Sequence, residues 1–310
     1  ITRFPPRVML VTMRGLIATE AEARAASDNP RGGVGAFLDS VGQRAAARRP
    51  LARGDLVNLE RFERSLRRAF AAPGARAVAL VLDSPGGSPA QSSLLHERLL
   101  ALRRDFPRVK LLAFVEDAAV SGGYYIACAA DEIVADHNSI VGSVGVISRG
   151  FGYVKSLRRK GVERRVFSAG DSKSGLDPFL PMRSRDLARQ RRLLRELHIN
   201  FIESVKRGRG DRLCAEEAAR LAYNTTASSW MPGWILRPSA ATLRSLVERG
   251  AGLFDGSVYS GSVALRLGLV DGLGEMRTDL ERRYGRNVQV VSCDPQTTVE
   301  LSRLLKAIFR

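Results

Sequence analysis

The hydrophobic pattern of the chain contains one uninterrupted apolar run of strand length, Ala77–Leu82. Such a run is typical of a strand that is buried on both faces, as in a parallel sheet covered by helices. Val8–Leu16 and Lys110–Val115 predict two further strands. Shorter strands are predicted at Glu132–Ala135, Val144–Ile147, Glu163–Phe167 and Val288–Val291.

Helical patterns lie between these strands. Leu56–Phe70 carries apolar residues every three or four positions, which predicts an amphipathic helix. Ser88 and Gln91 form a predicted capping box, and Pro89 suits the first helical position. We expect this second helix to end near Asp105. Further helical segments are predicted at Ser121–Ala130, Ser156–Lys160, Met182–Gly208, Val258–Val270 and Thr278–Tyr284. The alternation predicts an α/β fold of repeated strand–helix units.

Two regions interrupt the alternation and are interpreted as insertions. Thr19–Arg53 is rich in Ala, Arg and Gly without a sustained period, and Cys214–Phe254 is a second irregular region. The second region holds Trp230 and Trp234. We expect these rings either to form a flap that faces substrate or a membrane, or to pack the insertion on the core. The predicted divisions are residues 1–76 (strand, insertion and helix of the same unit), 77–284 (the main domain, with its insertion at about 214–254) and 285–310 (strand and tail).

Composition excludes wholesale disorder. Of the 310 residues, 45% are hydrophobic and 26% are charged, which is the balance of a globular protein. No stretch approaches the roughly 20 consecutive apolar residues of a bilayer span, although an anchor could precede Ile1. Cys128, Cys214 and Cys293 are odd in number and far apart, so neither a disulfide framework nor a zinc site is expected. A reducing compartment is favoured, such as the cytoplasm or the mitochondrial matrix, with membrane association through a segment outside this chain as an option.

The formal net charge is strongly positive, at +17, because the chain has 49 Lys and Arg residues and only 32 Asp and Glu residues. The arginines are spread over the whole chain. No zinc finger, basic zipper or aromatic RNA-binding motif accompanies them. We interpret the charge as a solvated surface and expect no specific nucleic-acid partner; the alternative is an anion- or nucleic-acid-binding surface driven by this charge.

Two strand–glycine–helix junctions carry the candidate chemistry. Ser84–Ser88 reads Ser-Pro-Gly-Gly-Ser, and Ser121–Gly123 reads Ser-Gly-Gly. Neither matches a phosphate loop or the dinucleotide fingerprint. Both would expose backbone N–H groups at a helix start, and two such donors facing each other would make an oxyanion hole. Ser121 is therefore a candidate nucleophile, and the alternative is that it is an ordinary N-cap.

A nucleophilic serine needs a base, and the sequence leaves two candidates. His96 and His198 lie inside predicted helices, so His137 is the one histidine suited to a triad with Ser121. The alternative is a lysine kept neutral by burial. Of the six lysines, Lys173 stands out because it sits in a turn-rich loop directly after a predicted strand.

Several motifs resemble the signal peptide peptidase A family of serine peptidases, including its SohB-like branch. They occur in the family's order: Ala79–Gly87, Val120–Ala127, Ile140–Val146, Ser172-Lys173-Ser174, Asp177-Pro178-Phe179, Gly261 and Gly268–Asp271. Ser121 and Lys173 are 52 residues apart, as the family pattern leads one to expect. The resemblance spans about Ala77–Tyr284 and is specific as a set, whereas one glycine motif alone would be weak.

This resemblance implies a ClpP/crotonase-like α/β fold and a Ser–Lys dyad. It implies Ser121 as nucleophile and Lys173 as general base. Gly87 and Gly122 match the family's oxyanion donors, and Ser143 matches a hydroxyl that orients the lysine. No metal, nucleotide or other cofactor is implied. Residues 77–284 then form the peptidase catalytic domain.

The expected function is that of a serine endopeptidase that hydrolyses signal-peptide remnants or other extended peptides. Its expected partners are peptide or protein substrates, further copies of the same chain in a homo-oligomer, and a membrane surface through peripheral contact. Two alternatives remain: a non-catalytic scaffold of the same fold in a membrane-associated assembly, and a crotonase-type acyl-CoA enzyme. The second would need carboxylates at the glycine junctions, where Asp83 and Glu116–Asp117 fit poorly.

Overall fold

The computed structural model describes residues 5–23, 56–227 and 238–295. The chain divides into two compact units. Unit 1 comprises Ile1–Glu20, Leu51–Gly145 and Phe201–Arg310, and unit 2 comprises Ala21–Pro50 and Val146–Asn200. Among the described helices, none is both long enough and apolar enough to cross a membrane.

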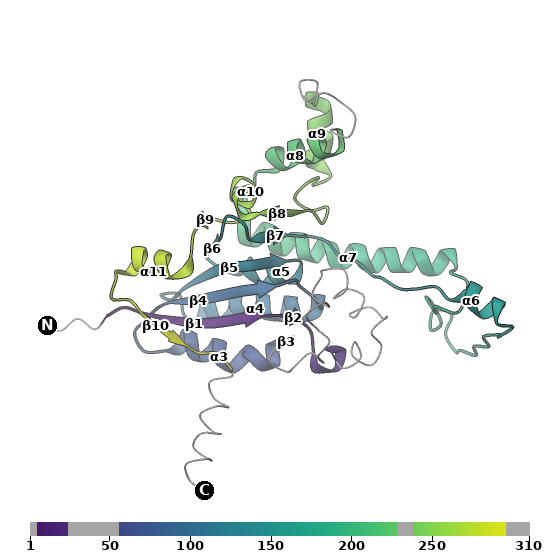
Figure 1. Cartoon of the computed structure of the whole chain (residues 1–310), viewed down its shortest axis with the longest axis horizontal. Helices are drawn as coiled ribbons and strands as arrows, with labels where there is room; N and C mark the ends of the chain where they lie inside the picture. Colours follow the sequence, from purple (N-terminus) through teal and green to yellow (C-terminus); the bar gives the residue numbers. More distant parts are fainter. Residues whose placement is uncertain (1–4, 24–55, 228–237, 296–310) are drawn as a thin grey trace, which may run out of the picture. The chain divides into compact units, whose positions relative to one another are not determined.

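Unit 1 is built on an eight-stranded sheet, and its main path is parallel throughout (Figure 1). The order along the path is β10 (Gln289–Ser292), β1 (Arg7–Arg14), β4 (Ala75–Ser84), β5 (Lys110–Val120), β6 (Glu132–Ala135) and β9 (Gly272–Leu273). β7 (Ile140–Gly142) pairs with the end of β5, and β8 (Val258–Ser260) pairs antiparallel with β7. β2 (Leu16–Ile17) and β3 (Leu56–Val57) form a separate pair. The predicted α/β fold is confirmed in this architecture.

Helices bury both faces of this sheet. Val78, Leu80 and Leu82 of β4 face a large core that also includes residues of α3 (Leu59–Ala71), α4 (Pro89–Asp105) and α5 (Gly122–Ala127). The alternate residues Ala77, Ala79 and Val81 face a second core with α11 (Met276–Tyr284). Successive side chains of a strand point to opposite faces, so both must be apolar here. This explains the uninterrupted run in the sequence.

Several predicted segments are wrong in type or position. Glu163–Phe167 has no regular structure, all of its residues are exposed, and it pairs with no strand in the part of the chain that the structure describes. The strand expected at Val144–Ile147 is replaced by β7, which ends at Gly142 because Gly142 and Ser143 both take positive φ values, 113° and 54°. Val258–Val270 begins with β8 and only then forms α10 (Gly261–Arg266).

The second predicted insertion is largely helical where it is described. After the 3₁₀ turn η3 (Gly210–Arg212) come α8 (Ala215–Ala227) and α9 (Ala240–Glu248). α8 buries Ala218 and Ala219 and opens with two glutamates, which suits a helix N-terminus. Trp230 and Trp234 lie outside the described residues, as does most of Thr19–Arg53.

The capping box predicted for α4 is also wrong. Ser88 is the N-cap and Pro89 opens the helix, but the Ser88 side chain makes no capping hydrogen bond. Its backbone N–H donates to the Ile17 carbonyl instead. The Gln91 amide oxygen accepts from the backbone N–H of Leu59, which ties α4 to the start of α3. The polar groups of this turn therefore form hydrogen bonds to neighbouring elements and do not cap the helix that they begin.

A buried ion pair connects the last turn of α7 (Ser184–Arg209) to the segment before β9. The Arg209 side chain is 0% exposed and holds the Asp271 carboxylate with two hydrogen bonds of 2.7 and 2.8 Å. The Ile133 N–H donates to the same carboxylate at 2.8 Å. Burial by itself would raise the pKa of Asp271, but the hydrogen bonds from Arg209 and Ile133 outweigh it and lower that pKa.

We expect Asp271→Asn to lower the free energy of unfolding by about 3 kcal/mol, because it leaves the buried guanidinium without its counter-charge. The Asp271 pKa is lower in the folded than in the unfolded chain, so its stabilisation is present above an unfolded pKa of about 4 and is lost as the pH falls below it. Urea denaturation at pH 7 and pH 4 measures both effects. Asp211→Asn, at an exposed position of η3, is the control. Equal stability of the two variants at pH 7 would contradict the assignment.

Candidate active site

The two glycine junctions meet at the carboxyl ends of the neighbouring strands β4 and β5. A Cβ atom on Gly86 would lie 2.8 Å from both the Ser121 Cβ and the Gly122 nitrogen. A Cβ on Gly122 would lie 3.4 Å from the Gly87 nitrogen. Glycine is required at Gly86 because the two turns approach so closely. This edge of a parallel sheet is where α/β proteins place their ligands.

Ser121 has an unusual backbone conformation between β5 and α5. Its φ is 51° and its ψ is −120°, values that are typical of glycine at the first central position of a type II′ turn. Its N–H donates to the Gly142 carbonyl of β7 at 2.8 Å, which holds the turn in place. The side chain is partly exposed and makes no capping hydrogen bond. Ser121 therefore occupies the N-cap position without acting as the helix cap.

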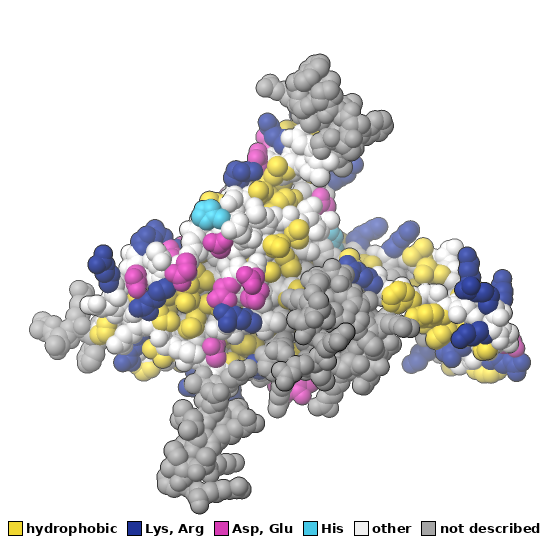
Figure 2. Space-filling model, viewed as in Figure 1, with side chains coloured by type: hydrophobic (Ala, Val, Ile, Leu, Met, Phe, Trp, Pro, Cys, Tyr) yellow, Lys and Arg dark blue, Asp and Glu magenta, His cyan; other side chains and the backbone are white. Residues whose placement is uncertain are grey.

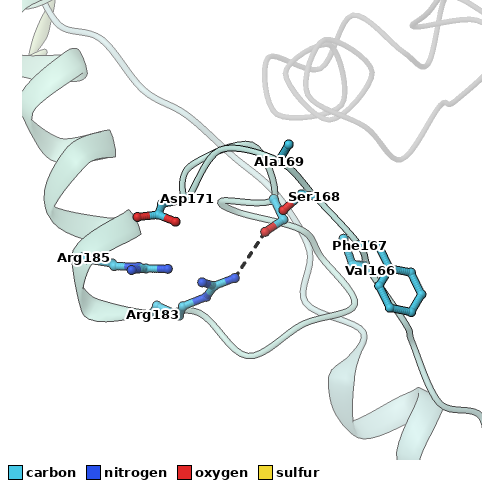
Figure 3. A pocket seen from close by; sticks show the side chains of 8 residues that line it. Val166, Phe167, Ser168, Ala169, Asp171, Arg183 and Arg185 are labelled. Atoms are coloured by element: carbon cyan, nitrogen blue, oxygen red, sulfur yellow. Dashed lines mark hydrogen bonds between the residues drawn. The ribbon is translucent and has the colours of Figure 1, made fainter.

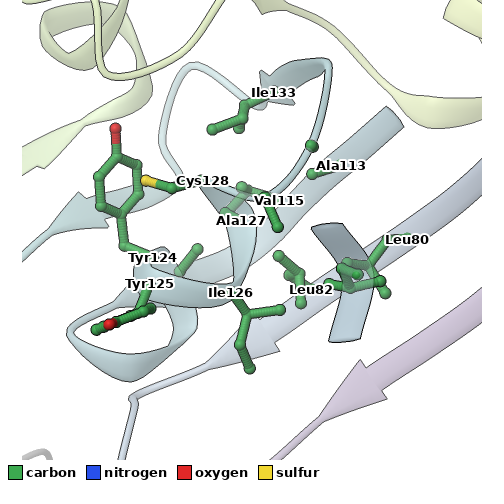
Figure 4. Close-up of a cluster of buried hydrophobic side chains, with 14 of the residues drawn as sticks. Leu80, Leu82, Ala113, Val115, Tyr124, Tyr125, Ile126, Ala127, Cys128 and Ile133 are labelled. Atoms are coloured by element: carbon green, nitrogen blue, oxygen red, sulfur yellow. The ribbon is translucent and has the colours of Figure 1, made fainter. Parts of the chain in front are cut away.

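The helix that follows Ser121 is fully buried and fixes the turn from behind. Every residue of α5 is buried. Figure 4 shows Ile126 of this helix toward Leu82 of β4, and Tyr124 beside Cys128, in one buried cluster that also includes Val115 of β5. The Tyr124 hydroxyl donates to the Leu269 carbonyl at 2.7 Å. Burial raises the pKa of Tyr124 well above its usual value, so this hydroxyl stays a donor.

Two backbone donors lie beside Ser121. Among the described residues, neither the Gly87 N–H nor the Gly122 N–H has a hydrogen-bond partner. Gly87 is placed by a bridge to Ile17, whose carbonyl also accepts from Ser88. Two unpaired N–H groups from adjacent turns are suited to stabilise a negative oxygen that develops next to the serine.

We expect Gly87→Ala to reduce both stability and any activity of this site. An added Cβ would lie 2.1 Å from the Ile17 carbonyl oxygen, and the φ of Gly87 is 146°. The loop must therefore move, at a cost of about 2 kcal/mol or more. Chemical denaturation and kinetics measure the two effects. Gly74→Ala is the matched control, because its φ is also positive but nothing lies within 4 Å of the added Cβ. An equal loss in both variants would assign the effect to φ alone.

Ser143 lies directly after β7 and next to Ser121 along the strand pair. Val120 pairs with Gly142, so the following residue of each strand is a serine at positive φ. The Ser143 N–H donates to the Ser257 carbonyl at 2.7 Å. The structure thus brings Ser121, Gly122, Gly87 and Ser143 together within unit 1.

Lys173 belongs to unit 2 and lies in a loop of turns, where it is exposed. Its N–H donates to the Gly170 carbonyl at 3.1 Å. Arg183 donates to the Ser174 hydroxyl at 3.2 Å, which holds this loop to the start of α7 (Figure 3). The cavity in Figure 3 has a volume of about 640 Å³, and Lys173 lines a neighbouring cavity of about 400 Å³. Unit 2 by itself does not bury the lysine amine.

The other sequence candidates do not join the serine. His137 is exposed in the turn after β6, and no hydrogen bond links it to Ser121 within unit 1. The carboxyl of Asp83, near the end of β4, has a raised pKa because it is partly buried and lies near Asp117. Within the described ranges, no group of three His, Cys, Asp or Glu side chains could hold a metal ion.

Two residues of the site were not singled out by the sequence prediction. Gly86 sets the contact between the two turns, and Gly142 supplies the carbonyl that holds the Ser121 N–H. Both lie inside segments quoted for the family resemblance. A glycine next to the end of a strand was the sequence signal that could have identified each of them, because such glycines mark turns and close approaches of the backbone.

Known proteins match most of this chain. The sequence pattern described as Peptidase family S49 matches residues 107–224, which include Ser121, Ser143 and Lys173. A Brucella abortus protein named Na(+)/H(+) antiporter NhaA is 41% identical over 231 residues, 74% of this chain and 27% of that protein. The Arabidopsis thaliana protein named Serine protease SPPA, chloroplastic, is 27% identical over 222 residues, 71% of this chain and 27% of that protein. The chain thus spans about a quarter of the length of these two relatives.

Among solved structures, a mutant of the 1510-N membrane-bound stomatin-specific protease in complex with a substrate peptide matches with a TM-score of 0.41. The sequence identity is 12%, and the match covers 94% of this chain and 93% of that chain.

Proposed function

We propose that this chain, which belongs to peptidase family S49 through residues 107–224, is a serine peptidase with a Ser–Lys dyad. Ser121 is the proposed nucleophile and Lys173 the proposed general base. Gly87 and Gly122 are the proposed oxyanion donors, and Ser143 is proposed to orient the lysine amine. One observation carries the proposal: a serine at positive φ that does not cap its helix lies beside two backbone N–H groups that have no partner in the described part of the chain.

The proposed reaction is acyl transfer in two steps. The Ser121 hydroxyl oxygen attacks the peptide carbonyl carbon, while Lys173 accepts the hydroxyl proton. The negative oxygen of the tetrahedral intermediate accepts hydrogen bonds from the Gly87 and Gly122 N–H groups. The intermediate collapses, the C–N bond breaks and the lysine returns the proton to the leaving amine. Water then repeats the sequence on the ester and releases the second product.

Labelling by a serine-reactive fluorophosphonate probe tests this proposal directly. Wild-type protein is expected to gain the mass of one probe on the peptide that contains Ser121, and Ser121→Ala is expected to gain none. Ser88→Ala is the matched control, because Ser88 lies at the neighbouring junction and its side chain makes no capping hydrogen bond. Equal labelling of Ser121→Ala and wild type would reject the nucleophile. No labelling of folded wild type would favour a non-catalytic scaffold.

The proposed substrates are extended peptides, including remnants of signal peptides. A peptide in an extended conformation presents its carbonyl groups to a nucleophile, and extended segments are a common form in which proteins bind peptides. Peripheral contact with a membrane is proposed as the way the enzyme meets such segments. Co-sedimentation of the chain with anionic and neutral vesicles measures this contact, and absence of binding to both would remove it.

Self-association is the remaining proposal about partners. Unit 2 exposes large apolar side chains among basic ones (Figure 2), including Phe167 at 94%, Met182 at 67% and Phe151 at 53%. Apolar surface of this kind favours an interface. We expect a homo-oligomer that loosens at low salt, because charges of +17 repel over about 30 Å at 0.01 M salt but about 8 Å at 0.15 M. Light scattering across this range measures the mass. A mass of 33.8 kDa under all conditions would contradict self-association.

A further inference from the structure

A second polar cavity lies in unit 1, directly after the last residue of α5. Its volume is about 200 Å³, which is several times the roughly 30 Å³ that one water occupies in the liquid. Its walls come from the middle of α4, the turn after α5 and the end of α7. The lining residues are His96, Leu100, Arg103, Cys128, Ala130, Asp131, Arg207, Gly208 and Arg212. None of them belongs to the candidate active site.

His96 contributes an unsatisfied acceptor to this region. The ring is 0% exposed and packs edge-on against Tyr125, with 5.2 Å between ring centroids. Its Nδ1 lies 2.9 Å from the Tyr125 carbonyl oxygen. A carbonyl only accepts, so Nδ1 carries the proton, and in the neutral ring Nε2 is a bare acceptor. Nε2 is buried and has no hydrogen-bond partner among the described residues.

The neutral ring is the form expected at physiological pH. Burial lowers the pKa of His96 below its usual value, and the nearby charges of Arg207 and Arg103 lower it further. A buried acceptor without a donor costs free energy, so a ligand that supplies a donor to Nε2 gains correspondingly. A ligand that satisfies this nitrogen must therefore donate a hydrogen bond from an O–H or N–H group.

The other polar walls offer hydrogen-bond donors. Three guanidinium groups line the cavity, and each already has a carboxylate partner: Asp131 for Arg103, Glu97 for Arg207 and Asp271 for Arg212. Within the described ranges Arg207 makes one hydrogen bond, to Glu97 at 3.1 Å, which leaves its Nε and Nη2 donors available there. Arg103 donates to Ala129 and Asp131 through its two Nη atoms and keeps its Nε donor. Arg212 is more fully used, by backbone carbonyls and by Asp271.

We propose that this cavity binds a small oxyanion that carries one acidic proton, of the hydrogen-phosphate type. Its unprotonated oxygens accept from the free donors of Arg207 and Arg103, and its P–OH group donates to His96 Nε2. A fully ionised anion such as sulfate would place an acceptor against another acceptor, and a single water has only two acceptor sites for the free donors of the two arginines. Hydrogen phosphate and a phosphate monoester share the required chemistry.

Binding of inorganic phosphate at pH 7.5 tests this site in the whole chain. Isothermal titration calorimetry is expected to show one saturable site, with sulfate at least about tenfold weaker because it lacks the donor. In ¹⁵N spectra of the histidine side chains, we expect the His96 Nε2 signal to shift when phosphate is added and to change little when sulfate is added. A glycerol phosphate series distinguishes the free ion from a monoester. Equal affinity for phosphate and sulfate, or an unchanged His96 signal, would overturn the proposal.

Variants separate this site from general binding to a basic surface. Arg207→Gln removes a guanidinium whose one ion pair, with Glu97, is exposed, so the fold should persist. It is expected to weaken phosphate binding about tenfold or more. Arg104→Gln is the matched control, since Arg104 is exposed on the same helix as Arg103 but does not line the cavity. Equal weakening by both variants would mean non-specific binding. The readout is binding, so its outcome is independent of the proposed peptidase activity.

Discussion

Lys173→Arg is expected to abolish peptide hydrolysis as completely as Lys173→Ala. A general base must lose its proton at the working pH, and an arginine side chain stays protonated. The variant keeps the positive charge and most of the length of the side chain, so it separates proton transfer from electrostatic attraction. A loss of about 10²-fold or more in kcat/KM on a fluorogenic peptide is expected for both variants.

Lys160→Arg is the matched control for this experiment, because Lys160 is an exposed lysine of the same unit. It is expected to keep wild-type kinetics. Substantial activity in Lys173→Arg would remove Lys173 as the base and move the test to His137→Ala.

The parts of the fold that follow from local pattern were predictable. The apolar run at Ala77–Leu82 requires two covered faces, and the structure supplies them with α3 and α4 on one side and α11 on the other. The length of α7 follows from its regular apolar spacing. The family resemblance is confirmed over residues 107–224. These features depend on periodicity and motif order, which a single sequence carries.

The features that were missed depend on contacts between distant segments. Glu163–Phe167 was predicted as a strand, but it has no regular structure and pairs with no strand of the described residues. Gln91 has a capping spacing, yet its side chain bonds to Leu59 from another helix. Arg209 carries no sequence signal that distinguishes it from the other arginines, although it forms the buried pair with Asp271. Long-range pairing overrides local preference in each case.

The candidate site also has features that the sequence predicts and features that it does not. The residue types of Ser121, Gly122, Gly87 and Ser143 could be taken from motifs, but their geometry could not. The positive φ of two serines is uncommon for residues other than glycine, and only the surrounding contacts impose it. Lys173 remains a prediction, because it lies in unit 2 and the serine lies in unit 1.

Ser121→Ala is expected to abolish peptide hydrolysis, by about 10³-fold or more in kcat, because it removes the proposed nucleophile. Its stability should stay within about 0.5 kcal/mol of wild type, since the side chain makes no capping hydrogen bond that could be lost. This combination is informative, because a serine that capped its helix would cost about 1 kcal/mol on replacement by alanine.

Ser121→Gly adds a second, opposite measurement on the same residue. Glycine adopts the φ of 51° without the steric penalty that serine and alanine share there, so about 1 kcal/mol or more of local strain is released. The freer unfolded chain offsets roughly 0.4–1 kcal/mol of this gain. Ser121→Gly is therefore expected to be at least as stable as Ser121→Ala, and equally inactive. At Ser88, where φ is −59°, the order should reverse, and Ser88→Gly should be less stable than Ser88→Ala. Urea denaturation of the four variants, together with kcat for each, decides the matter. If glycine destabilises both positions alike, Ser121 is not strained, and if either Ser121 variant turns over peptide at the wild-type rate, it is not the nucleophile.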